Sequence, residues 1–164
     1  MKKLLASIVC GSISMLLVGQ ALAENTDAFA ILGSTPFAQK NYGTNVVKGR
    51  AELHTGGTSS TMVSVWLTGL KPGSTHAGHI HRGTCVQLSP GEILNDLTPM
   101  VANEHGVGFS QTEIPANLAG LADCSWWVAF HEGPVNATPQ TPAIAVAPVI
   151  TRNEAHDETR GGKN

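Results

Sequence analysis

The sequence predicts an all-β domain, built as a sandwich or barrel of short strands. Strand signals dominate, and helical periodicity is nearly absent. The segment Thr61–Leu67 alternates, with Val63, Val65 and Leu67 on one face, and the turn cluster Gly69–Gly73 ends it. Short strands separated by turns of this kind are typical of sandwiches and barrels.

Further strands are expected where short apolar runs lie between turn signals. These candidates are Phe29–Leu32, Val46–Leu53, Val107–Thr112, Trp126–His131 and Ile144–Ile150. We interpret Ile114–Leu121 as a single helical turn. The chain shows no internal repeat and no linker, so the sequence indicates one domain.

The first 23 residues have the pattern of a secretory signal peptide. Lys2 and Lys3 precede the apolar run Leu4–Val18, and Ala21–Ala23 supplies an A-x-A cleavage pattern. The alternative is a membrane anchor, but the run is shorter than the ~20 residues that a spanning helix needs. We therefore expect cleavage after Ala23 and a periplasmic or secreted protein.

The rest of the chain is expected to contain a β domain over residues 24–152 and a disordered polar tail over 153–164. Without the leader, 8 basic and 12 acidic residues remain, a net charge of −4. Nucleic acid is bound through basic surface, so this balance argues against a nucleic-acid partner. No further apolar segment is long enough to indicate a membrane partner.

Two cysteines, Cys85 and Cys124, remain once Cys10 is removed with the leader. In an oxidising compartment we expect them to form a disulfide. The chain-entropy model gives roughly 4 kcal/mol for closing a loop of about 40 residues. The alternative is a pair of thiolates that holds a soft ion such as Cu(I).

Histidines are concentrated in the segment Thr75–Cys85, which contains an H-x-H pair. Residues two apart in a strand point to the same face, about 6.6 Å apart along the chain. His79 and His81 can therefore approach one ion while Ile80 faces the core. A third ligand has to come from elsewhere, and His131 at the end of an expected strand is the candidate. Neutral imidazoles suit copper and zinc.

Several motifs follow one another in a specific order along the chain. His76–Cys85 reads H-A-G-H-I-H-R-G-T-C, and Val128–Glu132 reads V-A-F-H-E. These motifs resemble the H-G-F-H-[VI]-H-E-x-G and V-V-H-E motifs of the copper/zinc superoxide dismutases. Val47–His54, Leu67–Leu70 and Leu97–Gly108 resemble further segments of that family, so the resemblance extends from about residue 29 to residue 150.

The resemblance implies a Greek-key β-barrel or sandwich, immunoglobulin-like and superoxide dismutase-like. His79, His81 and His131 match three of the family's copper ligands. His76 matches a histidine that is not a ligand there but hydrogen-bonds to backbone, and such partners orient the ligands. The implied cofactor is one copper ion, and no residue is assigned a catalytic role.

The chain departs from the family in two places: the zinc site, and the loop after V-V-H-E that guides the superoxide anion to copper in the family. Residues 86–95 contain no histidine, and their only acid is Glu92; no zinc site is therefore expected. Residues 133–142 contain no arginine, although the family has one in that loop. Cys85 matches the family's first disulfide cysteine, whereas Cys124 belongs to a different strand from the second, so the bridge would be rewired.

The remaining histidines and methionines are expected to have other roles. His54 and His105 are interpreted as surface residues and His156 as part of the tail. Met62 and Met100 are soft enough to complete a Cu(I) site, although an isolated methionine more commonly fills a core.

The sequence therefore predicts an exported copper-binding protein with weak or absent dismutase activity. For buffering, delivery or sensing of copper, the candidate partner is a copper-exchanging protein. The alternative is a copper-only superoxide dismutase that acts on superoxide. Two other interpretations are a three-histidine zinc site for hydration chemistry and a metal-free module resembling chordin-type domains.

Overall fold

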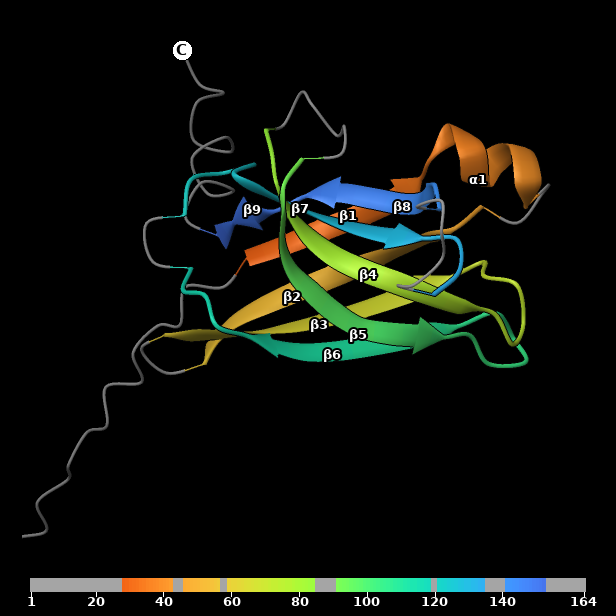
Figure 1. Ribbon diagram of the computed structural model, residues 1–164, viewed down its shortest axis with the longest axis horizontal. Coiled ribbons are helices and arrows are strands. Elements are labelled where there is room, and N and C mark those ends of the chain that lie inside the picture. Colours follow the sequence, from red (N-terminus) through yellow and green to blue (C-terminus); the bar gives the residue numbers. More distant parts are fainter. Residues whose placement is uncertain are drawn as a thin grey trace, which may run out of the picture.

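The computed structural model describes residues 28–42, 46–56, 59–84, 91–118, 121–134 and 141–152. These residues form an almost entirely antiparallel β structure with one short helix (Figure 1). The elements are β1 (Ala28–Ser34), α1 (Pro36–Asn41), β2 (Lys48–Gly56), β3 (Ser60–Thr68), β4 (Thr75–Arg82), β5 (Ile93–Val101), β6 (Gly108–Ile114), β7 (Trp126–His131), β8 (Ala143–Pro148) and β9 (Ile150–Thr151).

The strands form one sheet that curls into a nearly closed barrel (Figure 1). Its order is β5-β4-β7-β8-β1-β2-β3-β6, and β9 adds to β1. Strands β4, β5 and β6 follow one another around the barrel, and β7 returns to pair with β4. This arrangement is a Greek key, so the predicted all-β, Greek-key barrel is confirmed.

The barrel closes between β5 and β6 through side chains. Ser110 Oγ donates to Thr98 O at 2.6 Å, and Thr98 Oγ1 donates to Gln111 O at 3.0 Å. The Thr98 N–H donates to Thr112 Oγ1 at 2.7 Å. These bonds satisfy backbone groups at the two ends of the sheet, where unpaired strand edges would otherwise invite association.

The core contains mostly aliphatic side chains, with Phe130 as its largest fully buried residue. Phe130 lies over Gly78 on the paired strand, where a Cβ atom would come within 2.6 Å of the ring. Ile80 and Val128 belong to the same core. Trp127 and Ala129, which alternate with them, are buried but lie outside this cluster. The pair β4–β7 is therefore buried on both faces.

Six strands expected from the sequence are present, with Ile144–Ile150 divided between β8 and β9. Two elements were not expected: strand β5 and the helix α1. The helix had a local signal, because Thr35 caps its N-terminus through Oγ1 and Pro36 occupies its first turn. Within the segment Ile114–Leu121, where a helical turn was expected, Ile114 ends β6 and residues 115–118 are irregular. The Leu121 N–H donates to Leu118 O at 3.0 Å, which closes one turn at the end of the segment.

The predicted leader and polar tail lie outside the described residues. Among the residues that are described, no helix has the length and apolar character needed to cross a membrane.

Candidate metal centre

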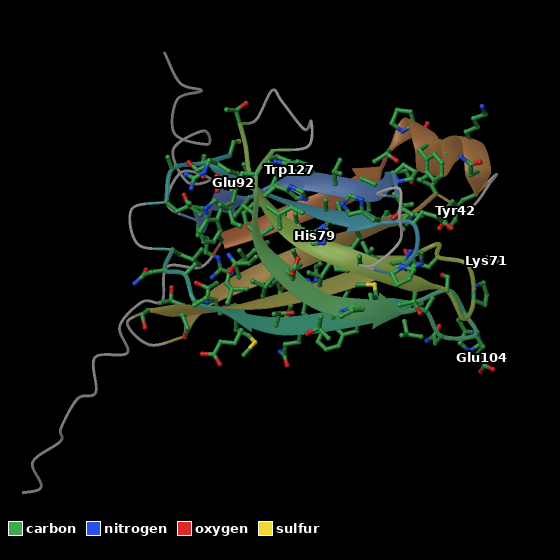
Figure 2. The ribbon with its side chains drawn as sticks, viewed as in Figure 1. Tyr42, Lys71, His79, Glu92, Glu104 and Trp127 are labelled. Carbon is green, nitrogen blue, oxygen red and sulfur yellow. The ribbon has the colours of Figure 1, made fainter. Side chains whose placement is uncertain are left out.

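The histidines of the H-x-H pair and His131 meet on the outer face of the β4–β7 pair. His79 and His81 alternate with the core residue Ile80, and cross-strand pairing places His79 opposite Ala129. His131 is two residues further along β7 on the same face as Ala129. Figure 2 labels His79 beside β4, together with Trp127 of β7. The predicted same-face arrangement therefore exists, and a second strand completes it.

The three imidazoles are buried and converge. Their exposed fractions are 5% for His79, 1% for His81 and 8% for His131. Each offers one ring nitrogen, and these nitrogens lie within 4.8 Å of one another. Nitrogens bound about 2.0–2.1 Å from a single ion are separated by at most about 4.2 Å. The arrangement therefore needs only a small contraction to coordinate one metal ion.

One buried nitrogen of each ring has no hydrogen-bond partner: Nδ1 of His79, Nε2 of His81 and Nε2 of His131. An unpaired buried polar atom costs about 1–3 kcal/mol, and each of these atoms is an available ligand. The candidate centre thus offers one Nδ1 and two Nε2 donors.

Two main-chain carbonyls fix the tautomers of His81 and His131. His81 Nδ1 lies 3.0 Å from Gly91 O, and His131 Nδ1 lies 2.7 Å from Thr141 O. A carbonyl only accepts, so each Nδ1 carries the proton and each Nε2 keeps its lone pair. In both cases the carbonyl belongs to the residue ten positions further along the chain.

A carboxylate rather than a carbonyl faces the third imidazole. His79 Nε2 is 3.5 Å from Asp96 Oδ1, on the strand paired with β4. This contact favours the proton on Nε2 and leaves Nδ1 as the ligand. The Asp96 side chain is 70% exposed, so His79 is held less firmly than the other two imidazoles.

Burial is the largest cause that lowers the pKa of His79 and of His81. For His79, the neighbouring His131 and His81 lower the pKa further, and Asp96 acts in the opposite direction. For His81, the hydrogen bond to Gly91 raises the pKa and His131 lowers it. Both imidazoles are therefore neutral near pH 7, which is the form that binds a metal.

His76 is fully buried beside the centre, and both of its ring nitrogens are engaged. Nδ1 donates to His131 O at 2.9 Å, and Nε2 lies 2.6 Å from Ser74 Oγ. His76 therefore contacts the backbone of a candidate ligand instead of pointing a free nitrogen into the centre. Its predicted role in orienting the site stays a prediction.

The other histidines and methionines lie apart from the centre. His54 and His105 are exposed and lie beside Glu52 and Glu104, respectively. Figure 2 shows Glu104 at the far right-hand tip of the β5–β6 turn. Met100 is a core residue that packs near Gly108. Met62 is partly buried on β3; His156 and Cys85 lie outside the described residues.

Two residues that contact the centre were missed by the sequence reasoning. Trp127 stacks on His81, with ring centroids 4.3 Å apart and an interplanar angle of 17°. It precedes His131 by four positions in a strand, so alternation alone would have placed it on the ligand face. Asp96 is brought to His79 only by the pairing of β4 with β5, and its position depends on an element that was not expected.

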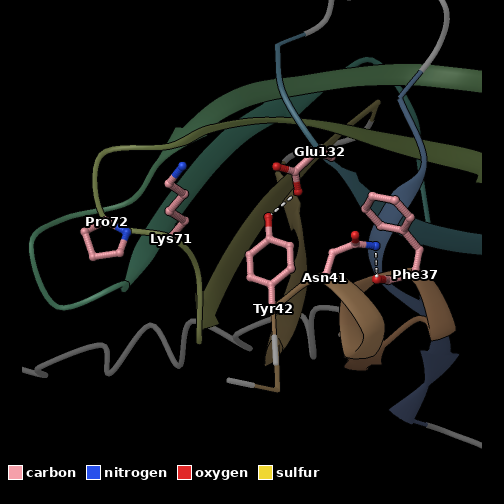
Figure 3. A pocket seen from close by; sticks show the side chains of 6 residues that line it. All are labelled: Phe37, Asn41, Tyr42, Lys71, Pro72 and Glu132. Atoms are coloured by element: carbon pink, nitrogen blue, oxygen red, sulfur yellow. Dashed lines mark hydrogen bonds between the residues drawn. The ribbon is translucent and has the colours of Figure 1, made fainter. Parts of the chain in front are cut away.

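A hydrogen bond connects the α1 region to the residue after His131. The Tyr42 phenol donates to Glu132, and both side chains line a pocket of about 420 Å³ (Figure 3). Burial, with Glu132, raises the pKa of Tyr42 well above its usual range, so the phenol stays a donor. The pocket lies outside the histidine group and shares with it only the chain segment around Glu132.

The fold is shared with known proteins. One solved structure similar to this chain is that of the clock protein EA4, with a TM-score of 0.52 and 16% sequence identity. The match covers 76% of this chain and 94% of that chain. No protein-family model matches the sequence, and no curated protein matches it. At this identity the likeness shows the fold alone. Together, the fold and the site define a β-barrel protein with a buried three-histidine group that could bind a metal ion.

We predict that the metal-free chain loses stability as the pH falls below about 6.5, the value for histidine in an unfolded chain. Because the folded pKa values of His79 and His81 are lowered, the unfolded state binds more protons in this range, and protonation favours unfolding. Urea midpoints of chelator-treated protein between pH 5 and 7.5 measure the effect. A His79→Ala/His81→Ala variant should show a weaker dependence; identical profiles would contradict the prediction.

Proposed function

We propose that this chain is an exported copper-binding protein with a superoxide dismutase-like fold that holds one copper ion through His79, His81 and His131. The observation that carries the proposal is the convergence of three buried, unpaired ring nitrogens. The apolar surroundings and the lowered pKa values keep His79 and His81 as neutral donors. When bound, copper would supply redox chemistry between its two oxidation states.

The donor set favours copper over other common ions. For a site of given nitrogen donors, affinity among divalent first-row metals peaks at copper and falls again for zinc. Zinc normally has four ligands in a closed site, and no fourth His, Cys, Asp or Glu belongs to the group among the described residues. Three imidazoles also suit Cu(I), which accepts low coordination readily.

A second, adjacent zinc site is not part of the proposal. The described residues contain no other group of three metal-ligating side chains. Glu92, the only acid between residues 86 and 95, contacts Arg82 at 3.0 Å. The carboxylate of Glu92 therefore already has a basic partner.

The surroundings of the centre favour holding copper over rapid dismutation. Asp96 places an exposed negative charge next to His79, and a negative charge repels the superoxide anion. The sequence has no histidine in residues 86–95 to carry a proton beside copper and no arginine in residues 133–142 to dock the anion. We therefore propose copper buffering, delivery or sensing, with a copper-exchanging protein as partner and a periplasmic or secreted location.

Because disulfides persist in an oxidising compartment, we also propose a disulfide between Cys85 and Cys124. Cys124 is 3% exposed, and Cys85 is the other cysteine that remains after Cys10 leaves with the leader. Protein isolated from its own compartment should have a mass two hydrogens below that of the reduced chain. Two free thiols in that sample would contradict the pairing and would support a thiolate metal site instead.

We predict that about one equivalent of copper binds per mature chain and that each candidate ligand is needed. Replacing His79, His81 or His131 with alanine should weaken copper binding at least about tenfold, since one of three donors is lost. Competition titrations against a chelator of known affinity measure this. His54→Ala and His105→Ala are matched controls, because both residues are exposed. Unchanged titrations in all three ligand variants would overturn the proposed site.

The second candidate function, a copper-only superoxide dismutase, is separated from the first by kinetics. Without an anion guide, the copper-loaded chain should react with superoxide far below the diffusion ceiling of about 10⁹ M⁻¹s⁻¹. Its rate should depend only weakly on ionic strength, because steered association falls steeply as salt rises. Pulse radiolysis at low and high salt gives both quantities. A rate near the ceiling with a steep salt dependence would show a working dismutase and replace the binding function.

A further inference from the structure

Among the described residues, the imidazole of His81 has an indole partner that neither of the other two candidate ligands has. Trp127 lies opposite His81 across the β4–β7 pair, and the two rings stack 4.3 Å apart at 17°. The ring contacts among the three histidines themselves are tilted or edge-on, with interplanar angles from 41° to 84°. Within the part of the chain that the structure describes, near-parallel stacking on a candidate ligand is therefore found at His81 alone.

The indole is fixed by its surroundings as well as by burial. Trp127 is 3% exposed, and its Nε1–H donates to Arg82 O at 3.2 Å. A Cβ atom at Gly83 would lie 2.2 Å from Trp127 Cδ1. The backbone that follows His81 thus supplies both an acceptor for the indole and the space for it.

Stacking and hydrogen bonding restrain different motions of the His81 ring. The bond from Nδ1 to Gly91 O fixes the position of one ring atom, but the ring can still rotate about that bond. A large flat ring at van der Waals distance restricts this rotation, because tilting the imidazole would produce a clash on one side and a gap on the other. Together, the hydrogen bond and the stacked indole fix the direction of the Nε2 lone pair in the metal-free protein.

We propose that Trp127 is a positioning residue that sets the orientation of His81 Nε2 and, through it, the geometry and reduction potential of the bound copper. This inference rests on the proposed function, because it needs a metal at the histidine group. It adds a role for a residue that neither the H-x-H motif nor the ligand set identifies. Second-layer partners of metal-binding histidines typically change metal affinity by about 10–100-fold when they are replaced.

The variants Trp127→Leu and Trp127→Phe test the proposal. Leucine removes the flat surface, so copper affinity should fall about 10–100-fold, the Cu(II) electron paramagnetic resonance spectrum should change, and the Cu(II)/Cu(I) potential should shift. Phenylalanine keeps a stacking ring and should restore the wild-type spectrum and potential. If Trp127 had only a structural role, both variants would have a changed melting temperature, and the copper spectrum and potential would not differ between leucine and phenylalanine.

Trp66→Leu is the matched control, because Trp66 also has an aromatic partner, Phe109, on strands that do not carry the histidines. Its copper spectrum, potential and affinity should equal those of the wild type. An unchanged copper spectrum and an unchanged reduction potential in Trp127→Leu would overturn the proposal. Failure of the wild-type chain to bind one copper would instead overturn the proposed function, so the two failures are distinguishable.

A measurement on the metal-free wild-type chain does not depend on the folding of any variant. The indole ring current should shift the carbon-bound ring protons of His81 upfield in the nuclear magnetic resonance spectrum, and those of His79 and His131 much less. Random-coil shifts for the His81 ring would show that the stack is absent in solution and would overturn the proposal.

Discussion

The antiparallel pairing of β4 with β7 is the interaction on which the candidate centre depends. Its register places Gly78 opposite Phe130 and Ile80 opposite Val128 on the core side. The alternate residues are then forced to the outer face, where His79 and His81 meet His131. A slip of one residue would exchange the two faces, and the imidazoles would enter an aliphatic core while Ile80 left it. Core packing therefore fixes the position of the histidines.

Burying these histidines has a free-energy cost that the fold only partly offsets. Gly91 O, Thr141 O and Asp96 satisfy the outer nitrogen of each ring. The inner nitrogens are left without partners, although unpaired buried polar atoms are rare in native proteins. In the metal-free state, the stabilisation from the rest of the core therefore has to exceed the free-energy cost of these unpaired nitrogens. A metal ion would satisfy all three atoms at once, so that metal binding would be coupled to folding free energy.

Local patterns in the sequence were sufficient to predict the strand face that carries the H-x-H pair, because a period of two is a property of any strand. The convergence of His131 with that pair depends on strand pairing over about 50 residues, and here the resemblance to a known family supplied what periodicity could not. Helix α1 was missed even though Thr35 and Pro36 form a standard helix start. Asp96 could not have been found from local pattern, since its approach to His79 requires β5.

The three candidate ligands are restrained by different contacts, and these contacts would determine which ligand leaves the copper ion first in a copper carrier. His81 is held by a carbonyl and by a stacked indole, and His131 by a carbonyl and by the contact of its own backbone with His76. The remote nitrogen of His79 faces only an exposed carboxylate at 3.5 Å. Release requires one ligand to move first, and the cost is lowest where the fewest contacts are broken. In the proposed carrier, exchange would therefore begin at His79, while His81 and His131 keep the rest of the site in place for the next ion.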